Sequence, residues 1–241
     1  MIKNNLKVKD GVSLIIPVLN EEKTLLTIIE KCSAQTVVEQ LVIVNDGSTD
    51  NTKNILNKIS KKNYTTPLIT ILHHKHNMGK GAAIKTGLSQ VLSKYVMVQD
   101  ADLEYSPDEI KYLFEAAEKT KNGIVFGTRS HYKRRGYLLA QIGNCYLNKM
   151  FNLLFRYHLT DSYTCYKLIP RIVWNKLNLR SNGFEIDSEL IAQLGMNHYL
   201  ISEVPISYSP RKYSEGKKIK WYDLFKATVV AIKIRIYNRC I

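Results

Sequence analysis

The chain has 241 residues, enough for one sizeable hydrophobic core, and its hydrophobic content of 45% excludes an intrinsically disordered protein. With 35 Lys and Arg residues against 21 Asp and Glu residues, the formal net charge is +14, which predicts anionic partners: phosphorylated substrates, acidic lipid headgroups or nucleic acid. The 4 cysteines are scattered without the spacing of zinc ligands, which favours free thiols in a reducing cytoplasm.

Apolar runs and segments of helical periodicity alternate from the N-terminus to about residue 128. This alternation predicts a mainly parallel, doubly wound α/β sheet, whose ligands bind beyond the carboxyl ends of the strands. The expected strands span residues 12–18, 41–45, 68–72, 95–99 and 123–127, and the expected helices span residues 21–32, 50–61, 80–93 and 107–120. Ser106, Pro107 and Glu109 predict a capping box at the start of the last of these helices.

The pattern changes in the second half of the chain. A basic loop at 130–137 precedes a segment with apolar residues at helical spacing, 138–155. Further on, we expect a helix at 185–196, a short strand at 199–208 and a second basic loop at 209–220.

The C-terminal segment, residues 221–241, is predicted as a basic amphipathic helix that follows one α/β domain over residues 1–220. Its apolar stripe consists of Trp221, Leu224, Phe225, Val229, Ile232 and Ile236, and its positive charges are Lys226, Lys233, Arg235 and Arg239. Such a helix either lies at the surface of an anionic membrane or packs on the domain. We find neither an apolar stretch of roughly 20 residues nor a signal peptide. We therefore expect a cytoplasmic protein, soluble or peripheral at the cytoplasmic face of a membrane.

Three acidic residues at alternate positions, Asp100, Asp102 and Glu104, follow the apolar run at 95–99. Residues two apart on an extended segment point to the same side, so these carboxylates are predicted to converge. They repel one another unless a cation neutralises them, and hard oxygen ligands suit Mg²⁺ or Mn²⁺. A solvated acidic loop is the alternative, but the position at the carboxyl edge of the sheet favours the metal. Mg²⁺ is commonly shared with substrate phosphates, so the site implies a diphosphate ligand.

The ends of the first two predicted strands carry further polar residues. Asn20 and Glu21 follow the first strand, and Asp46 follows the second. Each of these groups by itself is typical of helix caps and turns. Together with the acidic cluster, they instead predict one ligand site at the sheet edge.

The segment 74–87, HKHNMGKGAAIKTG, is predicted to bring Lys80 and a helix N-terminus toward a bound phosphate. It matches neither the Walker A pattern nor GxGxxG. His73, His74 and His76 are crowded in a loop, and we interpret them as surface residues rather than as a metal site.

Seven ordered motifs resemble those of family 2 glycosyltransferases with the GT-A fold. The resemblance is closer to the polyprenyl (dolichyl or undecaprenyl) phosphate sugar transferases, such as the dolichyl-phosphate mannose and glucose synthases, and it extends from about residue 11 to residue 230. The motifs are SLIIPVLNEE, VIVNDGSTDNT, HNMGKGAAIKTGL, VQDADLEYSPDEI, FGTRS, TDSYTCYKLI and EVPISYSPRKYSEGKKIKWYD. The resemblance implies a Rossmann-like GT-A domain with a helical C-terminal extension.

The resemblance also implies roles for individual residues. Those expected to bind the nucleotide sugar are Pro17, Leu19, Glu21, Asp46, Lys80, Asp100 and Ala101. Those expected to hold Mg²⁺ or Mn²⁺ are the DxD pair Asp100 and Asp102, with Glu104 as a further ligand. Those expected to be catalytic are Asp102, Arg129 and Asp161. Those expected to face an acceptor phosphate are Arg129, Arg211, Lys217 and Lys218.

Three departures from the family pattern accompany these expectations. Glu104 stands where the polyprenyl subgroup often has glutamine, and Asn45 stands where many relatives have aspartate. Thr164 and Cys165 replace the small Ser-Gly pair that usually follows the catalytic loop aspartate.

The implied reaction is an inverting transfer of a hexose from a UDP- or GDP-sugar to a polyprenyl phosphate. A phosphate acceptor is already largely ionised at neutral pH, so it needs orientation, which the planar guanidinium groups of Arg129 and Arg211 suit. The alternative is a saccharide hydroxyl, which needs a general base such as Asp161 or Asp187. For Asp187, a favourable interaction with the dipole of its own helix is the preferred explanation.

Two other classes of protein are less consistent with the sequence. A nucleic-acid-binding protein would explain the charge, but no RRM, KH, helix-turn-helix or zinc-finger signature is visible, so no nucleic acid partner is expected. A catalytically silent nucleotide-binding scaffold would not need the intact pair Asp100 and Asp102.

Overall fold

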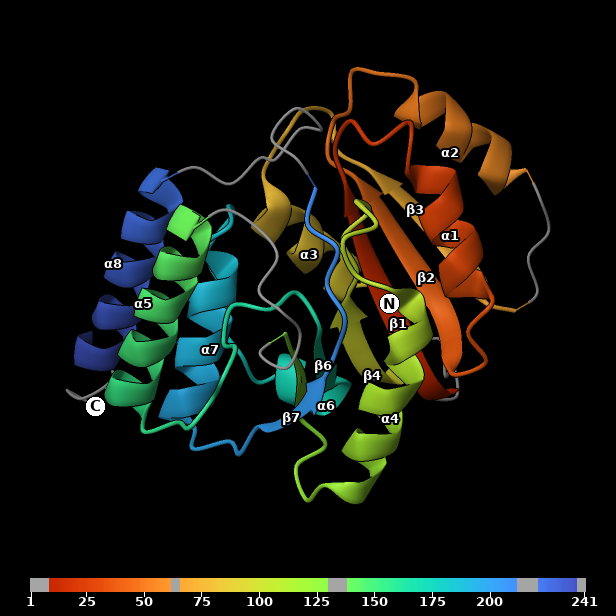
Figure 1. The fold of residues 1–241 in the computed structure, drawn as a ribbon. Coiled ribbons are helices and arrows are strands. Elements are labelled where there is room, and N and C mark those ends of the chain that lie inside the picture. The colour runs from red at the N-terminus through yellow and green to blue at the C-terminus, as the bar shows by residue number, and fades with distance from the viewer. Residues whose placement is uncertain (1–8, 62–65, 130–137, 212–220, 238–241) are drawn as a thin grey trace, which may run out of the picture.

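The computed structural model describes residues 9–61, 66–129, 138–211 and 221–237. Within these ranges a 7-stranded sheet has the order β3-β2-β1-β4-β6-β5-β7 (Figure 1). The strands are β1 (Lys9–Val18), β2 (Val38–Asn45), β3 (Leu68–His73), β4 (Ser93–Val98), β5 (Val125–Thr128), β6 (Lys167–Pro170) and β7 (Ser202–Pro205). β6 runs antiparallel to β4 and β5, and the other pairs are parallel. The expected α/β fold with a mainly parallel sheet is therefore confirmed.

Helices cover both faces of this sheet. They are α1 (Leu25–Ser33), α2 (Thr52–Ser60), α3 (Lys80–Leu88), the 3-10 turn η1 (Pro107–Glu109), α4 (Ile110–Lys119), α5 (Leu138–Phe155), α6 (Arg171–Trp174), α7 (Ile186–Met196) and α8 (Trp221–Tyr237). Side chains of α1, α2 and α4 pack on one face. Those of α3, α5, α6 and α7 pack on the other, where α8 joins the outside of the helical layer (Figure 1).

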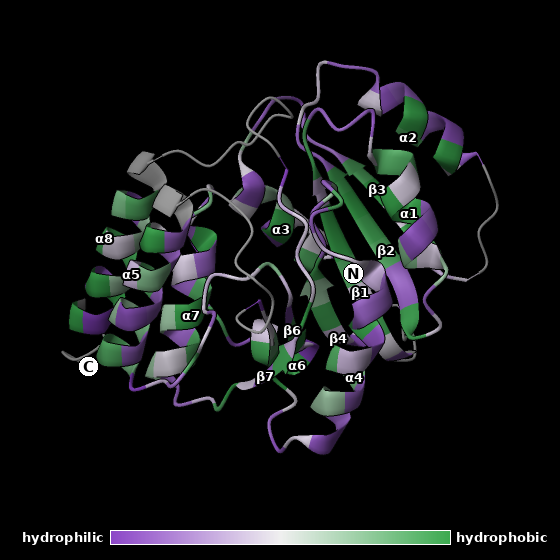
Figure 2. Ribbon diagram, viewed as in Figure 1, coloured by the Kyte–Doolittle hydropathy of each residue, from purple (hydrophilic) through white to green (hydrophobic). Residues whose placement is uncertain are grey.

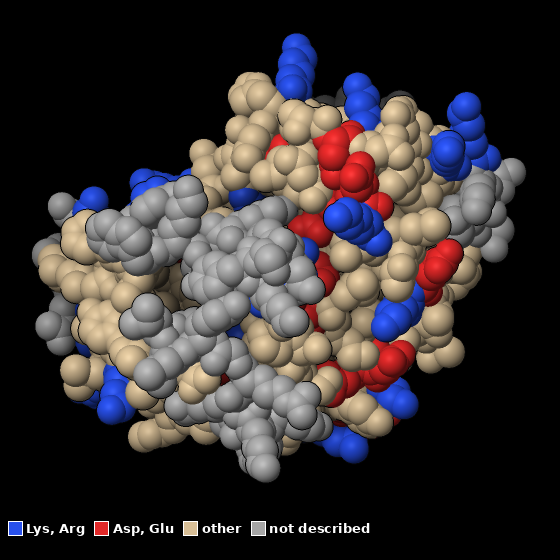
Figure 3. Space-filling model, turned by 45° about the horizontal axis from the view of Figure 1, so that its top comes forward, with Lys and Arg blue, Asp and Glu red and all other residues tan. Residues whose placement is uncertain are grey.

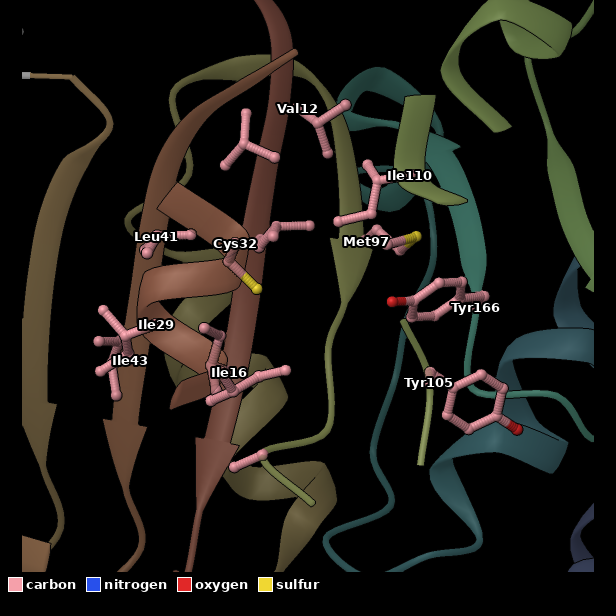
Figure 4. Close-up of a cluster of buried hydrophobic side chains, with 14 of the residues drawn as sticks. Val12, Ile16, Ile29, Cys32, Leu41, Ile43, Met97, Tyr105, Ile110 and Tyr166 are labelled. Carbon is pink, nitrogen blue, oxygen red and sulfur yellow. The ribbon is translucent and has the colours of Figure 1, made fainter. Parts of the chain in front are cut away.

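β1 lies inside the sheet and is buried on both faces. Leu14 and Ile16 belong to the cluster that includes α1 and α4, whereas Ile15 between them belongs to the cluster of α3 and α7. Figure 4 shows the first cluster, with Ile29 and Cys32 of α1 beside the strands. Figure 2 shows that the central strands are hydrophobic and that the loops beyond them are largely hydrophilic. Packing on both faces thus fixes the strand ends from which these polar loops begin.

Some boundaries differ from the expected ones. β5 begins at Val125 and ends at Thr128, and β7 is limited to 4 residues of the expected strand at 199–208. β6 and α6 were not expected, because each has only 4 residues, too few to show a periodicity.

The expected capping box before α4 is wrong. Ser106 forms no side-chain cap, and its hydroxyl instead donates to Asp108 Oδ2 at 3.1 Å. Glu109 Oε1 accepts from the backbone N of Ser207 at 2.8 Å, so this carboxylate ties the turn to the segment after β7. Pro107 does occupy the first helical position, as expected.

The C-terminal helix α8 packs against α7 and α5. Ala227 and Ala231 are buried, whereas Phe225, Ile232 and Ile236 are exposed. The packed arrangement, one of the two alternatives, is therefore present. None of the helices in the described ranges is long and apolar enough to cross a membrane. The division into a domain over residues 1–220 and a separate helix stays a prediction.

Candidate active site

The acidic loop after β4 begins at the carboxyl edge of the sheet. The backbone N of Gln99 donates to Ile15 O at 2.9 Å, which places the loop beside β1. Asp100 Oδ1 then lies 2.7 Å from Lys80 Nζ, and Asp102 Oδ2 lies 3.1 Å from Arg211 Nη2. Two neighbouring carboxylates are thus each paired with a cation from a distant part of the chain.

Glu104, the third acidic residue, holds the segment after β7. Its Oε2 accepts from the Tyr208 hydroxyl at 2.7 Å, and its Oε1 accepts from the backbone N of Arg211 at 2.9 Å. Among the described residues, no group of three His, Cys, Asp or Glu side chains is arranged to hold a metal ion. The assignment of Glu104 as a metal ligand therefore stays a prediction.

Asp102 is the carboxylate whose ionisation the fold disfavours. Burial, followed by the negative charges of Asp100 and Glu104, raises the pKa of Asp102 to about 6. The pKa of Asp100 is lowered instead. Burial by itself would raise it, but the Lys80 ammonium outweighs burial and holds the pKa below its ordinary value. A divalent cation would offset the repulsion between the carboxylates, and it prefers such hard oxygen ligands. Asp100 and Asp102 thus fit a divalent cation chemically.

Arg211 connects the acidic loop with the end of β1. Its Nη1 lies 3.2 Å from Glu21 Oε2, and its Nη2 lies 3.1 Å from Asp102. The buried Nε has no hydrogen-bond partner among the described residues. Arg211 therefore contacts one residue expected in the nucleotide pocket, Glu21, and two expected to bind metal, Asp102 and Glu104. Lys217 and Lys218, expected beside it, lie outside the described residues.

Asp46, at the end of β2, anchors the loop that leads into α3. Its carboxylate accepts from the backbone N of Met78 and of Gly79, both at 2.8 Å. Its Oδ1 also lies 2.7 Å from His74 Nδ1. Both carboxylate oxygens are therefore engaged within the protein, and they set the position from which α3 begins.

The interpretation of His74 as a surface residue is wrong. Its side chain is only 8% exposed, and its Nε2 lies 2.9 Å from Thr86 Oγ1 of α3. The ring therefore bridges Asp46 and α3. His73 and His76 are exposed, as expected.

The N-terminus of α3 is partly occupied by the chain itself. Ala82 N donates to Asn182 O at 3.1 Å. Gly79, with a φ of 99°, packs so closely on the same carbonyl that a Cβ would collide with it. Since the amides of Met78 and Gly79 face Asp46, it is Lys80 Nζ that carries this segment's positive charge to the acidic loop.

The remaining expected nucleotide contacts lie near the same edge. Pro17 is the last residue but one of strand β1, and Leu19 follows the strand. Ala101 lies within the acidic loop, between Asp100 and Asp102, and its side chain is buried in the core.

Arg129 directly follows β5 and forms a two-point ion pair with Asp161. Arg129 Nε donates to Asp161 Oδ2 at 2.6 Å, and Nη2 donates to Oδ1 at 2.8 Å. The guanidinium carbon also lies over two aromatic rings, 5.9 Å from the centroid of Tyr105 and 4.9 Å from that of Tyr208. These contacts fix the plane of the guanidinium. The structure thus brings together two residues expected to be catalytic.

Tyr208 links this ion pair to the acidic loop, because it stacks on Arg129 and donates to Glu104. Figure 3 shows Asp and Glu side chains gathered in a band on one face of the molecule, with Lys and Arg side chains beside it. Acidic groups that suit a cation and a fixed guanidinium that suits an anion therefore occur in one connected site.

Comparison with known proteins assigns the chain to a family. Residues 13–181, more than half of the chain, match Glycosyl transferase family 2. The chain belongs to this family of glycosyltransferases. Its fold is similar to that of glucosyl-3-phosphoglycerate synthase from Mycobacterium tuberculosis, solved with Mn²⁺, uridine-diphosphate and phosphoglyceric acid. The TM-score is 0.70 at 16% identity, over 94% of this chain and 78% of that one. The expected GT-A-like fold is therefore confirmed.

Two curated relatives are sugar transferases that act with dolichyl phosphate, according to their names. The glycosyltransferase is 29% identical to the dolichyl-phosphate beta-glucosyltransferase of Trichomonas vaginalis, over 94% of this chain and 73% of the relative. It is 27% identical to the UDP-N-acetylglucosamine–dolichyl-phosphate N-acetylglucosaminyltransferase of Methanococcus voltae, over 94% of this chain and 93% of the relative. The family assignment shows that the chain is a glycosyltransferase, and both relatives are named as transferases of hexoses.

A buried ion pair in the glycosyltransferase was not expected from the sequence. Lys167 Nζ lies 2.7 Å from Asp187 Oδ1, with the lysine side chain only 3% exposed, and it also donates to Thr164 O. Asp187 is in the first turn of α7, as expected. The signal that was available is a lysine inside the apolar run YKLI, because a buried ammonium requires an anionic partner.

The aromatic support of Arg129 was also missed. Tyr105 is buried and stacks on Tyr166, with ring centroids 5.0 Å apart, while Tyr208 comes from beyond β7. No spacing in the sequence connects tyrosines that lie this far apart.

Proposed function

We propose that the glycosyltransferase transfers a hexose from a UDP- or GDP-sugar to the phosphate of a polyprenyl lipid, with inversion at the anomeric carbon. The observation that carries the proposal is the fixed guanidinium of Arg129, held by Asp161 and stacked on Tyr105 and Tyr208. A planar, oriented cation suits a phosphate better than a neutral hydroxyl. The names of the two dolichyl-phosphate transferases support the same class of acceptor.

On the donor side, Asp100 and Asp102 would hold Mg²⁺ or Mn²⁺. The cation would neutralise charge that develops on the leaving nucleoside diphosphate. The Mn²⁺ and uridine-diphosphate in the similar solved structure support this assignment. Lys80, already paired with Asp100, would add positive charge near the same phosphates. The residues proposed to line the rest of the nucleotide-sugar pocket are Pro17, Leu19, Glu21, Asp46 and Ala101.

On the acceptor side, the chain's own residues would orient an anion rather than remove a proton. A phosphate monoester has a second pKa of about 6, so it is largely a dianion at neutral pH. Asp161 accepts from Arg129 with both oxygens, so its role here is to orient the guanidinium. Arg211, with Lys217 and Lys218, is proposed to contribute further positive charge to the acceptor phosphate.

Purified protein incubated with Mn²⁺ and a panel of UDP- and GDP-sugars tests this function directly. We expect transfer to a short-chain polyprenyl phosphate from one donor, and no product when the corresponding free alcohol replaces the phosphate. Removal of the cation with EDTA should stop the transfer, and Mn²⁺ should restore it. Product formed only with a saccharide acceptor would refute the phosphate assignment and favour a hydroxyl acceptor.

A lipid acceptor requires access to a membrane surface, and we propose that α8 provides part of the contact. Phe225, Ile232 and Ile236 are exposed on α8, together with Lys226 and Lys233. Exposed apolar side chains flanked by lysines are typical of helices that bind anionic bilayers. The protein would thus act at the cytoplasmic face of a membrane.

Replacing Phe225 and Ile236 together by Glu should weaken binding to vesicles. In a flotation assay with phosphatidylglycerol-containing vesicles, we expect about a tenfold lower bound fraction for the double variant. Each change removes apolar surface that the bilayer would bury and adds a negative charge that the anionic lipids repel. Leu200→Glu is the matched control, because Leu200 is an exposed leucine between α7 and β7. Equal flotation of all three proteins would contradict the proposed contact.

A further inference from the structure

The segment between α5 and β6, residues 156–166, carries Asp161 and is named here the Asp161 loop. Most of its described contacts with α5 are made by side chains, although Tyr166 O at its end accepts from the backbone N of Gly127 of β5 at 2.8 Å. Asn148 and Asn152 of α5 both donate to Leu159 O, at 2.7 and 2.8 Å. Asn148 Oδ1 also accepts from the backbone N of Ser162 at 2.9 Å. The conformation of the loop therefore depends on a few specific side chains.

Glu203 of β7 holds the two residues at the centre of this loop. Its Oε2 accepts from the backbone N of Thr160 at 2.8 Å and from the Thr160 hydroxyl at 3.0 Å. Its Oε1 accepts from the backbone N of Asp161 at 3.0 Å. One carboxylate thus binds consecutive amides, one of which belongs to the residue that pairs with Arg129.

The same carboxylate connects the loop with β5. Glu203 lies opposite Phe126 of β5 in the strand register, and Thr128 Oγ1 of β5 lies 2.7 Å from Thr160 Oγ1. Because the Thr160 hydroxyl donates to Glu203, it can accept from Thr128. Arg129 directly follows Thr128. Contacts through Glu203 and Thr160 therefore fix the positions of Arg129 and Asp161 relative to each other.

The contacts require an acceptor with no proton of its own. Two N–H groups and one hydroxyl all point at Glu203, and an ionised carboxylate is the side chain that accepts from all of them. A glutamine of the same shape would turn an NH₂ group toward one of these donors. The position therefore discriminates between Glu and Gln on chemical rather than steric grounds.

We propose that Glu203 is a positioning residue for sugar transfer, acting through Asp161 on the orientation of Arg129. Glu203 reaches the ion pair of Arg129 and Asp161 through the backbone N of Asp161. The inference rests on the proposed function in one respect: it takes Arg129 to be the group that orients the acceptor.

The test compares Glu203→Gln with the wild-type protein. We expect kcat/KM for the acceptor to fall about tenfold to a hundredfold, as for a small misplacement of an orienting group, with KM for the donor sugar unchanged. Glu118→Gln is the matched control, because Glu118 is an ion-paired glutamate, 2.8 Å from Lys94, on α4 and away from the site. Thermal unfolding verifies that all variants are folded.

Coupling to Asp161 separates positioning from a general structural role. If Glu203 acts through Asp161, the double variant Glu203→Gln/Asp161→Asn should be no slower than Asp161→Asn alone. Hydrogen exchange of a peptide covering residues 156–166 should also be faster in Glu203→Gln, because two amides lose their acceptor. Three results would each overturn the assignment. They are a loss of kcat/KM in the double variant equal to the product of the two single losses, a rise in the donor KM as large as the fall in kcat/KM for the acceptor, and unchanged acceptor kinetics in Glu203→Gln.

Failure of the proposed function is a separate outcome. It would appear in the wild-type protein, as transfer to a saccharide hydroxyl and none to polyprenyl phosphate. The kcat/KM values of the variants relative to the wild-type protein are then measured with the saccharide acceptor, and the hydrogen-exchange experiment is repeated. The same criteria decide the role of Glu203.

Discussion

Replacement of Asp102 by Asn is expected to lower kcat for sugar transfer at least about a hundredfold, because it removes a charged ligand of the proposed cation. The loss should be accompanied by weaker Mn²⁺ binding, measured by the free-Mn²⁺ electron paramagnetic resonance signal. Steady-state kinetics at saturating donor and Mn²⁺ gives the change in kcat. Asp108→Asn is the control, since Asp108 is an exposed carboxylate of the neighbouring turn η1, where it contacts Gln35 and Ser106.

The stability of Asp102→Asn distinguishes lost chemistry from lost structure. The raised pKa of Asp102, about 6, means that ionising this group costs folding free energy. The protonated side chain contributes its full stability below the pKa of the unfolded state, and this contribution is lost as the pH rises through the folded pKa. At pH 7 the ionised side chain therefore lowers the free energy of unfolding. The melting temperature of Asp102→Asn at pH 7 should therefore not fall by much, even though its contact with Arg211 is lost. Unchanged turnover and Mn²⁺ binding in this variant would contradict the metal assignment.

The sheet and the position of its carboxyl edge were predictable because the strands that build them are continuous apolar runs. β1, β2 and β4 are buried on both faces, and intervening helices force neighbouring strands to be parallel. The acidic loop follows one of these runs, so its place at the carboxyl edge follows from the order of the elements alone. The same reasoning fails for β6, whose 4 residues gain their position only by pairing with β4 and β5.

The partners of individual side chains were not predictable, because they depend on contacts between distant segments. The spacing of the three acidic residues predicted a common side, but not their partners. Asp100 pairs with Lys80, whereas Asp102 and Glu104 both contact Arg211. Glu104 is bound by a backbone N that lies 107 residues further along the chain. His74 was misjudged for the same reason, since Asp46 is 28 residues away from it. Local charge patterns therefore located the site without determining its pairing.

Glu203 illustrates a functional position that leaves little trace in the sequence. It lies in a strand of 4 residues, SEVP, where an outward-facing glutamate would be unremarkable. Its role becomes visible only when the strand is placed beside β5 and the Asp161 loop is folded over it. The backbone amides of Thr160 and Asp161, rather than any side-chain pattern, make this carboxylate specific.

Arg129→Lys is expected to reduce kcat/KM for the acceptor about a hundredfold, while KM for the donor stays unchanged. Lysine keeps the charge but loses the planar fork that binds both oxygens of Asp161 and stacks on Tyr208. Kinetics with varied acceptor at saturating donor measures the effect. Arg171→Lys is the control, because Arg171 Nη1 donates to Val91 O at 3.2 Å near the opposite, amino-terminal end of β4.

The companion variant Asp161→Asn decides what the ion pair does. If Asp161 only orients Arg129, its loss should resemble that of Arg129→Lys, and the pH dependence of kcat/KM should keep the shape of the wild-type profile. If Asp161 were instead the base for a hydroxyl acceptor, its removal would delete the limb of that profile that requires a deprotonated carboxylate. A selective rise of the donor KM in Arg129→Lys would contradict both interpretations, because it would place the guanidinium on the nucleotide. The ion pair therefore offers two substitutions whose pH profiles and KM values separate phosphate orientation from proton removal.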